Sequence, residues 1–322
     1  MNFTRRSFQL ALAAGVLAGT TSVQAQADYP NRPVRIIVPF AAGGPADNYA
    51  RFIGQRLQAE LKQTFVVDNR PGAGSVIGTD AVAKSPPDGY TLLMMSNTHT
   101  VNETLMPNKP FKLMDDFVGV APVNYSDLVL VVHPSVQART LPELIALAKS
   151  RPGKMNYASS GTGTPYHMAG ELFKHLAGIN VTHIPYKGSS GARSDLLGGQ
   201  VDMMFDAVTT MMPQAREGKV RALATTGQTR AVPELPTVAE VVPKYEATIW
   251  LGLMAPKATP PEVVNKLNAA VRKIVADPEV KAAWAKQGAV PMSMTVPEFT
   301  KHLNEDIAKW AEIVRVSGAK PE

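Results

Sequence analysis

Short apolar runs alternate with amphipathic stretches along most of the chain, and polar, glycine-rich segments separate them. The runs predict buried strands over 34–38, 64–68, 90–95, 118–123, 128–132, 155–158, 181–184, 202–205, 220–225 and 248–254. Between several of these runs, apolar residues three or four positions apart predict helices, as at Tyr49, Ile53 and Leu57. The tail after the last strand is predicted to be helical. This alternation predicts an α/β fold whose mostly parallel sheets are covered by helices.

Two lobes are predicted within this α/β chain. The runs 128–132 and 248–254 bracket a segment that has its own strand–helix alternation. We therefore assign 28–128 and 252–322 to lobe 1 and 129–251 to lobe 2. A ligand would sit between the lobes and contact loops from both.

The stretch 154–176 contains the clearest sequence signal for a binding site. A short strand leads through a loop of small hydroxyl residues and glycines to Pro165, where a helix is predicted to begin. The unpaired N–H groups of the first helical turn, the helix dipole and the nearby hydroxyls favour an anion such as a carboxylate. The candidate ligand residues here are Ser159, Ser160, Gly161, Thr162, Thr164 and His167. A well-capped turn that binds nothing stays an open alternative.

A second strand–glycine-loop–helix unit spans 34–61. Gly43 and Gly44 allow backbone to come close to a ligand. The candidate ligand residues in this loop are Phe40, Ala41, Ala42, Gly43, Gly44 and Asp47. The alternative is a tight turn in which Asp47 begins the helix.

Polar residues also follow other predicted strands. In open α/β sheets, ligands bind at the carboxyl ends of strands. These positions make candidates of Ser96, Asn97, Tyr186, Lys187 and Asp206. Asp206 is a carboxylate among groups that favour an anion, so we hypothesise that it contacts a ligand ammonium, amide or hydroxyl. A role in capping a helix is the alternative.

The first 27 residues have the pattern of a secretory leader. Arg5 and Arg6 precede an apolar run over 10–19, and small-x-small patterns end at Ala25 and Ala27. We expect a periplasmic protein that is cleaved near one of these alanines, by either the general secretory or the twin-arginine route. The chain has no cysteine, so disulfides and cysteine metal sites are excluded. The formal net charge of +6 is spread without basic blocks, and no nucleic-acid partner is expected.

Catalytic and metal motifs are weak in this sequence. His167, Glu171 and His175 are four residues apart on one predicted helix, but the outer pair is separated by about 12 Å and would not converge on one ion. His167 is expected instead to line the pocket or to cap the loop. The chain has no Gly-x-Ser-x-Gly elbow and no Walker pattern. A serine triad assembled in space stays open as an alternative.

Taken together, the ordered motifs resemble the Bug family, the substrate-binding receptors of tripartite tricarboxylate transporters. The matching segments are YPNRPVRIIVPF at 29–40, 42–47, 69–74, 86–92, 158–164, His167 with 169–172, and 181–188. The resemblance implies a two-lobed periplasmic-binding-protein fold, type II-like, that closes as a flytrap. It also implies a monomer without cofactor that grips a small carboxylate through the loops 40–47 and 159–164 and delivers it to membrane transporter subunits. A ligand-sensing receptor for a signalling partner, or a periplasmic hydrolase or isomerase, are the alternatives.

Overall fold

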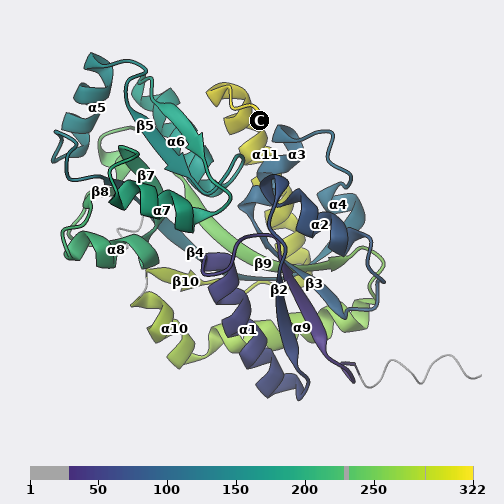
Figure 1. Ribbon diagram of the computed structural model, residues 1–322. Coiled ribbons are helices and arrows are strands. Elements are labelled where there is room, and N and C mark those ends of the chain that lie inside the picture. The colour runs from purple at the N-terminus through teal and green to yellow at the C-terminus, as the bar shows by residue number, and fades with distance from the viewer. Residues whose placement is uncertain (1–28, 228–231, 287, 322) are drawn as a thin grey trace, which may run out of the picture.

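The computed structural model describes residues 29–227, 232–286 and 288–321. The predicted leader and its cleavage sites lie outside these residues. Figure 1 shows the chain colour passing from purple strands through teal and green elements to the yellow C-terminal helix. No helix in the described ranges is long and apolar enough to cross a membrane.

Strands and helices alternate through the first part of the chain. They are β1 (Val34–Val38), α1 (Pro45–Leu61), β2 (Phe65–Asn69), the 3-10 helix η1 (Ala73–Ser75), α2 (Val76–Ala83), β3 (Thr91–Ser96), α3 (Asn97–Leu105), α4 (Leu113–Asp116) and β4 (Phe117–Val132). The apolar spacing predicted for α1 is confirmed, because Tyr49, Ile53 and Leu57 are buried in the core beside Trp284.

The alternation continues through the middle of the chain and ends in helices. The middle elements are α5 (Leu141–Ser150), β5 (Asn156–Ser159), α6 (Pro165–Ala177), β6 (Thr182–Pro185), α7 (Ser189–Leu197), β7 (Met203–Ala207), α8 (Val208–Arg216), β8 (Arg221–Thr225), η2 (Val238–Glu240) and β9 (Thr248–Pro256). The tail contains α9 (Pro261–Ala276), α10 (Pro278–Ala285), β10 (Ala289–Pro291) and α11 (Val296–Ser317). The prediction of a helical tail is therefore confirmed apart from the short strand β10.

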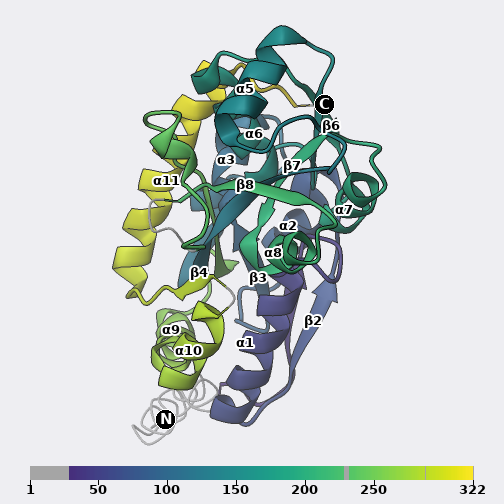
Figure 2. The same ribbon diagram turned by 90° about the vertical axis from the view of Figure 1, so that its left-hand side faces the viewer.

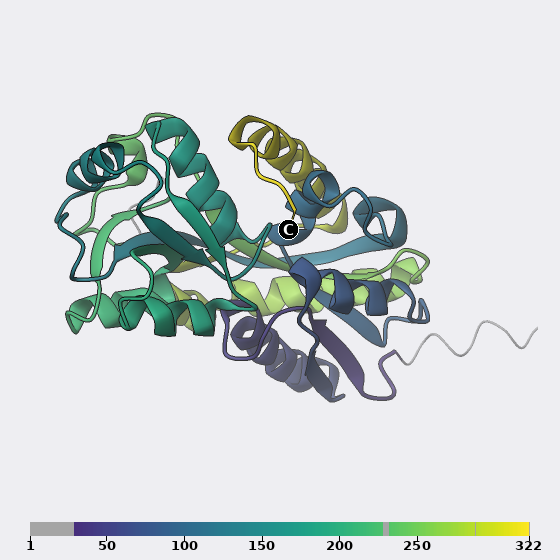
Figure 3. The same cartoon turned by 45° about the horizontal axis from the view of Figure 1, so that its top comes forward.

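One curled, mixed sheet runs through the molecule in the order β2-β1-β3-β9-β4-β7-β5-β6, with β8 and β10 also paired to β4. At one end β2, β1 and β3 are parallel, and at the other end β7, β5 and β6 are parallel. The antiparallel strands β4 and β9 join these two sets. Figures 2 and 3 show the teal and green elements grouped on one side of these strands and the purple and blue elements on the other. This is the two-lobed α/β arrangement that the sequence predicted.

The strand β4 corrects one sequence prediction. The runs 118–123 and 128–132 were expected to be separate strands, but they form one strand of 16 residues. The polar residues between them stay extended because Tyr125, Ser126 and Asp127 pair with β9, and Tyr125 and Ser126 also pair with β10. Its first part pairs with β9 and β10, whereas Leu128–Val132 pairs with β7 and β8.

The long helix α11 contacts both ends of the molecule. Phe299 and Leu303 pack in a core with β3 residues, whereas Trp310 and Val314 pack with Tyr157 of β5. Helix α11 therefore lies against α3, β4 and α6, and it covers the region where β4 and β9 connect the two sets of strands.

Candidate functional site

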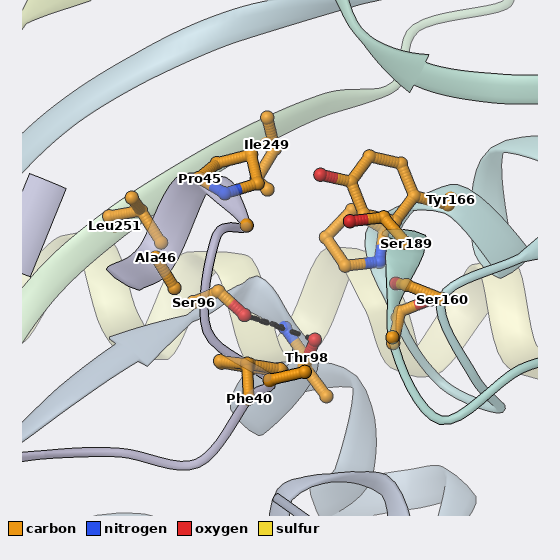
Figure 4. A pocket seen from close by; sticks show the side chains of 15 residues that line it. Phe40, Pro45, Ala46, Ser96, Thr98, Ser160, Tyr166, Ser189, Ile249 and Leu251 are labelled. Carbon is orange, nitrogen blue, oxygen red and sulfur yellow. Dashed lines mark hydrogen bonds between the residues drawn. The ribbon is translucent and has the colours of Figure 1, made fainter. Parts of the chain in front are cut away.

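A small cavity of about 40 Å³ lies where the two ends of the sheet meet. Figure 4 shows the side chains of the 15 residues that line it. One wall comes from the β1–α1 loop and the start of α3, the opposite wall comes from the starts of α6 and α7, and Ile249 and Leu251 of β9 form the base. None of the 15 described lining residues carries a formal charge.

Four helices begin at this cavity. Their N-cap residues, Gly44 of α1, Ser96 of α3, Thr164 of α6 and Gly188 of α7, all line it. Pro45 and Pro165 have no N–H, and the Thr98 and His167 N–H groups donate to their own N-cap side chains. The other N–H groups of these first turns have no partner within their helix, and each dipole has its positive end there. Two positive ends on each wall therefore make the cavity attractive to a negatively charged group.

The β1–α1 loop is fixed by Asp47, a buried residue that does not line the cavity. One Asp47 oxygen accepts a hydrogen bond from the Gly43 N–H at 2.9 Å, and the other lies 2.9 Å from Arg51. Burial raises the pKa of Asp47, but its bonds to Arg51 and Gly43 outweigh this effect and lower the pKa overall. The Asn69 amide also donates to the Phe40 carbonyl at 3.1 Å. These bonds fix the loop so that Phe40, Ala41 and Gly44 face the cavity.

The β5–α6 loop is held by two histidines. His167 accepts a hydrogen bond from the Gly163 N–H at 3.0 Å, so the prediction that it caps the loop is confirmed. His183 Nε2 lies 2.6 Å from Ser159 Oγ, and the two imidazole rings stack with centroids 4.1 Å apart. Burial lowers the pKa of His167 to about 4, with a smaller contribution from Lys174. The neutral imidazole is the form that can accept from Gly163.

An outer groove of about 660 Å³ opens beside the cavity. The two share Phe40, Ala41, Ser160, Thr164 and Gly188, so these residues form the boundary between them. Gly161, Thr162, Tyr186 and Lys187 line only the groove. The Tyr186 hydroxyl donates to Asp195 at 2.5 Å, within the same lobe.

Asp206 is placed differently from the sequence expectation. It is fully buried, its carboxylate forms a two-point ion pair with Arg193, and it accepts from the Ala207 N–H at 2.7 Å. Asp206 was expected to contact a ligand ammonium, amide or hydroxyl, but it lines neither the cavity nor the groove and its carboxylate is paired with Arg193. Arg193 neutralises it, because α7 places the guanidinium beside the end of β7.

The predicted site residues divide into three groups. Phe40, Ala41, Gly44, Ser96, Ser160 and Thr164 line the cavity; Gly161, Thr162, Tyr186 and Lys187 line the groove; and Ala42, Gly43, Asp47, Asn97, Ser159, His167 and Asp206 line neither. Several members of the third group position the others. Asn97, for example, donates to the Thr248 carbonyl at 2.8 Å and so connects α3 to β9.

Sequence reasoning missed several residues of the cavity wall. They are Pro45, Ala46, Thr98, Pro165, Tyr166, Gly188, Ser189, Ile249 and Leu251. A signal existed for those that directly follow the chosen loops, because the first helical turn shares the anion chemistry of its N-cap. No local signal marked Ile249 and Leu251, since they belong to a continuous apolar strand.

Neither a metal centre nor a serine nucleophile is assembled in the cavity. Within the part of the chain that the structure describes, no group of three His, Cys, Asp or Glu side chains could hold a metal ion. Ser159 and His183 form a close pair, but Ser159 has no exposed surface and does not line the cavity. This serine supports the loop and does not face a substrate.

A family model and a curated relative both place this chain in the same protein family. A family model described as "Tripartite tricarboxylate transporter family receptor" matches residues 49–319. Protein BugT of Bordetella pertussis is 40% identical over 328 residues, and the alignment covers 99% of this chain and 99% of BugT.

Solved structures of two other proteins are similar to this chain over almost its whole described length. R. palustris Rpa4515 with adipate has a TM-score of 0.88 and 33% identity, covering 91% of this chain and 100% of its own. MatC from Rhodopseudomonas palustris, with bound malate, has a TM-score of 0.83 and 31% identity, covering 89% of this chain and 100% of its own.

Proposed function

The chain belongs to the tripartite tricarboxylate transporter receptor family, and we propose that it captures a small carboxylate between its lobes and delivers it to the membrane subunits of such a transporter. Members of this family are solute-binding receptors that act in the periplasm. The two similar structures that contain adipate and malate support a carboxylate ligand. The observation that carries the proposal for this chain is the meeting of four helix N-termini around one cavity.

In this proposal, hydrogen-bond donors and helix dipoles, and not a charged side chain, hold the ligand carboxylate. Backbone N–H groups of the first helical turns and the hydroxyls of Ser160 and Ser189 would donate to its oxygens. Such bonds strengthen when water is excluded, so closure of the lobes favours retention and opening favours release. A site without formal charge holds an anion reversibly, because no buried cation is left unpaired when the ligand departs.

We assign 28–128 and 252–322 to lobe 1 and 129–251 to lobe 2. The division is supported by β4 and β9, which connect the two sets of parallel strands. Bending of these two strands would open and close the cavity, since few other segments cross between the lobes. Helix α11 contacts both lobes and would have to slide along α6 or move with it.

A receptor is favoured over an enzyme by the cavity lining. The described residues that line it include serines but no His, Asp, Glu, Lys or Cys, so no side chain of the lining could act as the base that activates a serine hydroxyl. We propose that the protein has no catalytic activity and needs no cofactor. We also propose that it acts as a monomer after removal of a leader near Ala25 or Ala27. A sensing role would differ only in the partner that docks with the closed form.

The proposal is tested by calorimetry on the purified mature protein. Small carboxylates are expected to bind, whereas the corresponding amides are not. Ser160→Asp would place a negative charge in the cavity and lower affinity at least about 100-fold, because like charges a few ångströms apart repel by several kcal/mol. Ser160→Asn has nearly the same shape without the charge and serves as the matched control.

Two results would contradict the proposal. One is equal affinity of Ser160→Asp and Ser160→Asn for every carboxylate that the wild type binds. The other is chemical turnover of the carboxylate, which mass spectrometry of the recovered ligand would detect.

A further inference from the structure

The Tyr166 side chain is a polar group of the cavity that the proposed function does not yet use. Tyr166 is the second residue of α6 and is 4% exposed. Its hydroxyl is buried and has no hydrogen-bond partner among the described residues. Figure 4 shows the ring beside Ser189 on one wall, with the hydroxyl directed toward Pro45 on the other. Buried hydroxyls in folded proteins are nearly always paired, so this one points to a ligand acceptor.

The Tyr166 hydroxyl acts as a donor in the working pH range. Burial raises the pKa of Tyr166 well above its usual value, and the nearby charge of Asp206 raises it further. The phenol therefore stays protonated and offers its hydrogen to an oxygen atom. The side chains of Ile249, Leu251 and Pro45 in the lining are apolar and cannot accept that bond, and the hydroxyl forms no hydrogen bond with Ser189 beside it.

The number of donors around the cavity exceeds what one carboxylate can satisfy. A carboxylate accepts about four hydrogen bonds. The first-turn N–H groups that are not used in capping, together with the hydroxyls of Ser160, Ser189 and Tyr166, outnumber that. The excess is divided between the two walls, which suits a ligand with an acceptor group at each end.

The size of the cavity limits the distance between those two groups. The enclosed volume is small, at about 40 Å³, so the shorter of two diacids is favoured. The Tyr166 ring occupies the end of the space opposite Phe40 and Ser96. A four-carbon chain fits such a space better than a six-carbon chain.

We propose that Tyr166 is a specificity-determining residue that donates a hydrogen bond to the distal carboxylate of a short dicarboxylic acid, and that its ring excludes longer diacids. This inference rests on the proposed function and names the ligand class of the same site. The proximal carboxylate binds at the helix N-termini, and the Tyr166 hydroxyl favours ligands that carry a distal carboxylate as well.

Calorimetry with succinate, butyrate and adipate tests this role. Wild-type protein is expected to bind succinate more tightly than butyrate. Tyr166→Phe keeps the ring and should weaken succinate binding about tenfold or more, with less than about a twofold change for butyrate. Tyr166→Ala should shift the preference from succinate toward adipate. Tyr49→Phe is the matched control, because the Tyr49 hydroxyl is also buried without a partner but lies outside the cavity.

The outcomes separate the two proposals. If Tyr166→Phe leaves the ratio of succinate to butyrate affinity unchanged, or if wild-type protein binds butyrate as tightly as succinate, the role of Tyr166 is overturned while carboxylate capture stands. If wild-type protein binds no carboxylate, the proposed function itself is overturned, and this inference with it. Thermal unfolding of each variant establishes that it is folded.

Discussion

Two buried histidines support the walls of the site at the residue scale. His167 is 4% exposed and accepts from the Gly163 N–H. His99 is 1% exposed, accepts from the Ser96 N–H at 3.2 Å and contacts Thr79 Oγ1 at 2.9 Å. Burial lowers the pKa of each imidazole to about 4. Both rings are therefore neutral at neutral pH, which is the state that supports the backbone around the cavity.

Acidification is expected to destabilise the protein through these histidines. In the unfolded chain their pKa is about 6.5, so between about pH 6.5 and pH 4 the unfolded state binds protons that the folded state does not. The free energy of unfolding should therefore fall as pH is lowered, by up to about 2 kcal/mol per histidine between pH 6.5 and pH 5. Urea unfolding at several pH values measures this. The variant with both His99→Gln and His167→Gln should show a shallower dependence, and an unchanged slope would refute the assignment.

Glycines in the left-handed region shape the ends of α6 at the element scale. Gly163 precedes the helix with φ +75°, and Gly178 ends it with φ +61°. A Cβ at Gly163 would lie 2.6 Å from Asn102 Oδ1 and 2.9 Å from a Leu105 methyl, both on α3. A Cβ at Gly178 would meet nothing within 4 Å. The loop before α6 therefore needs glycine for packing against α3 as well as for backbone conformation.

Alanine variants at Gly163 and Gly178 separate the need for a left-handed backbone from the need for space beside α3. Both Gly163→Ala and Gly178→Ala should lose about 1 kcal/mol of stability from left-handed strain. Gly163→Ala should lose roughly 1–3 kcal/mol more from overpacking, and it should also weaken carboxylate binding, because the loop that lines the cavity must shift. Urea unfolding and calorimetry measure the two effects. Equal stability and equal affinity of the two variants would show that the contact with α3 is unimportant.

The two lobes meet across the cavity at the scale of the whole molecule. A Cβ at Gly44 of α1 would lie 3.7 Å from Ser189 Oγ of α7. Lobe movement must separate these two positions, since they belong to opposite walls. The chain contains no cysteine, so an engineered pair of thiols would have no competitor for disulfide formation.

The double variant Gly44→Cys with Ser189→Cys is expected to lock the lobes closed when oxidised, because a side chain at 44 starts only 3.7 Å from the side-chain oxygen of Ser189, which is within reach of a disulfide. Succinate loaded before oxidation should be retained through dialysis, and succinate added after oxidation should be excluded. Reduction should restore exchange. The single variants control for the loss of the serine hydroxyl. Equal rates of succinate exchange in the oxidised and reduced protein would contradict closure by lobe movement.

Local patterns in the sequence were sufficient for most elements. The apolar runs predicted most of the strands correctly, and the spacing of Tyr49, Ile53 and Leu57 predicted α1, because each pattern reflects which side of one element is buried. At Ser96 and Asn97 the sequence predicted polar ligand-contacting residues at a strand end, and no helix was predicted there. The segment after Ser96 forms α3, since a capping box at Ser96 and burial of the helix outweigh the low helix propensity of Asn97 and Thr98.

The sequence by itself determined the alternation of strands and helices and the two anion-favouring loops, because these depend on neighbours within one or two turns of chain. Only the tertiary structure decided that β4 is continuous, that Arg193 neutralises Asp206 and that Tyr166 borders the cavity. Each of these features depends on contacts between separate elements. Such contacts are set by how β4 and β9 bring the two lobes together, and no local pattern specifies that geometry.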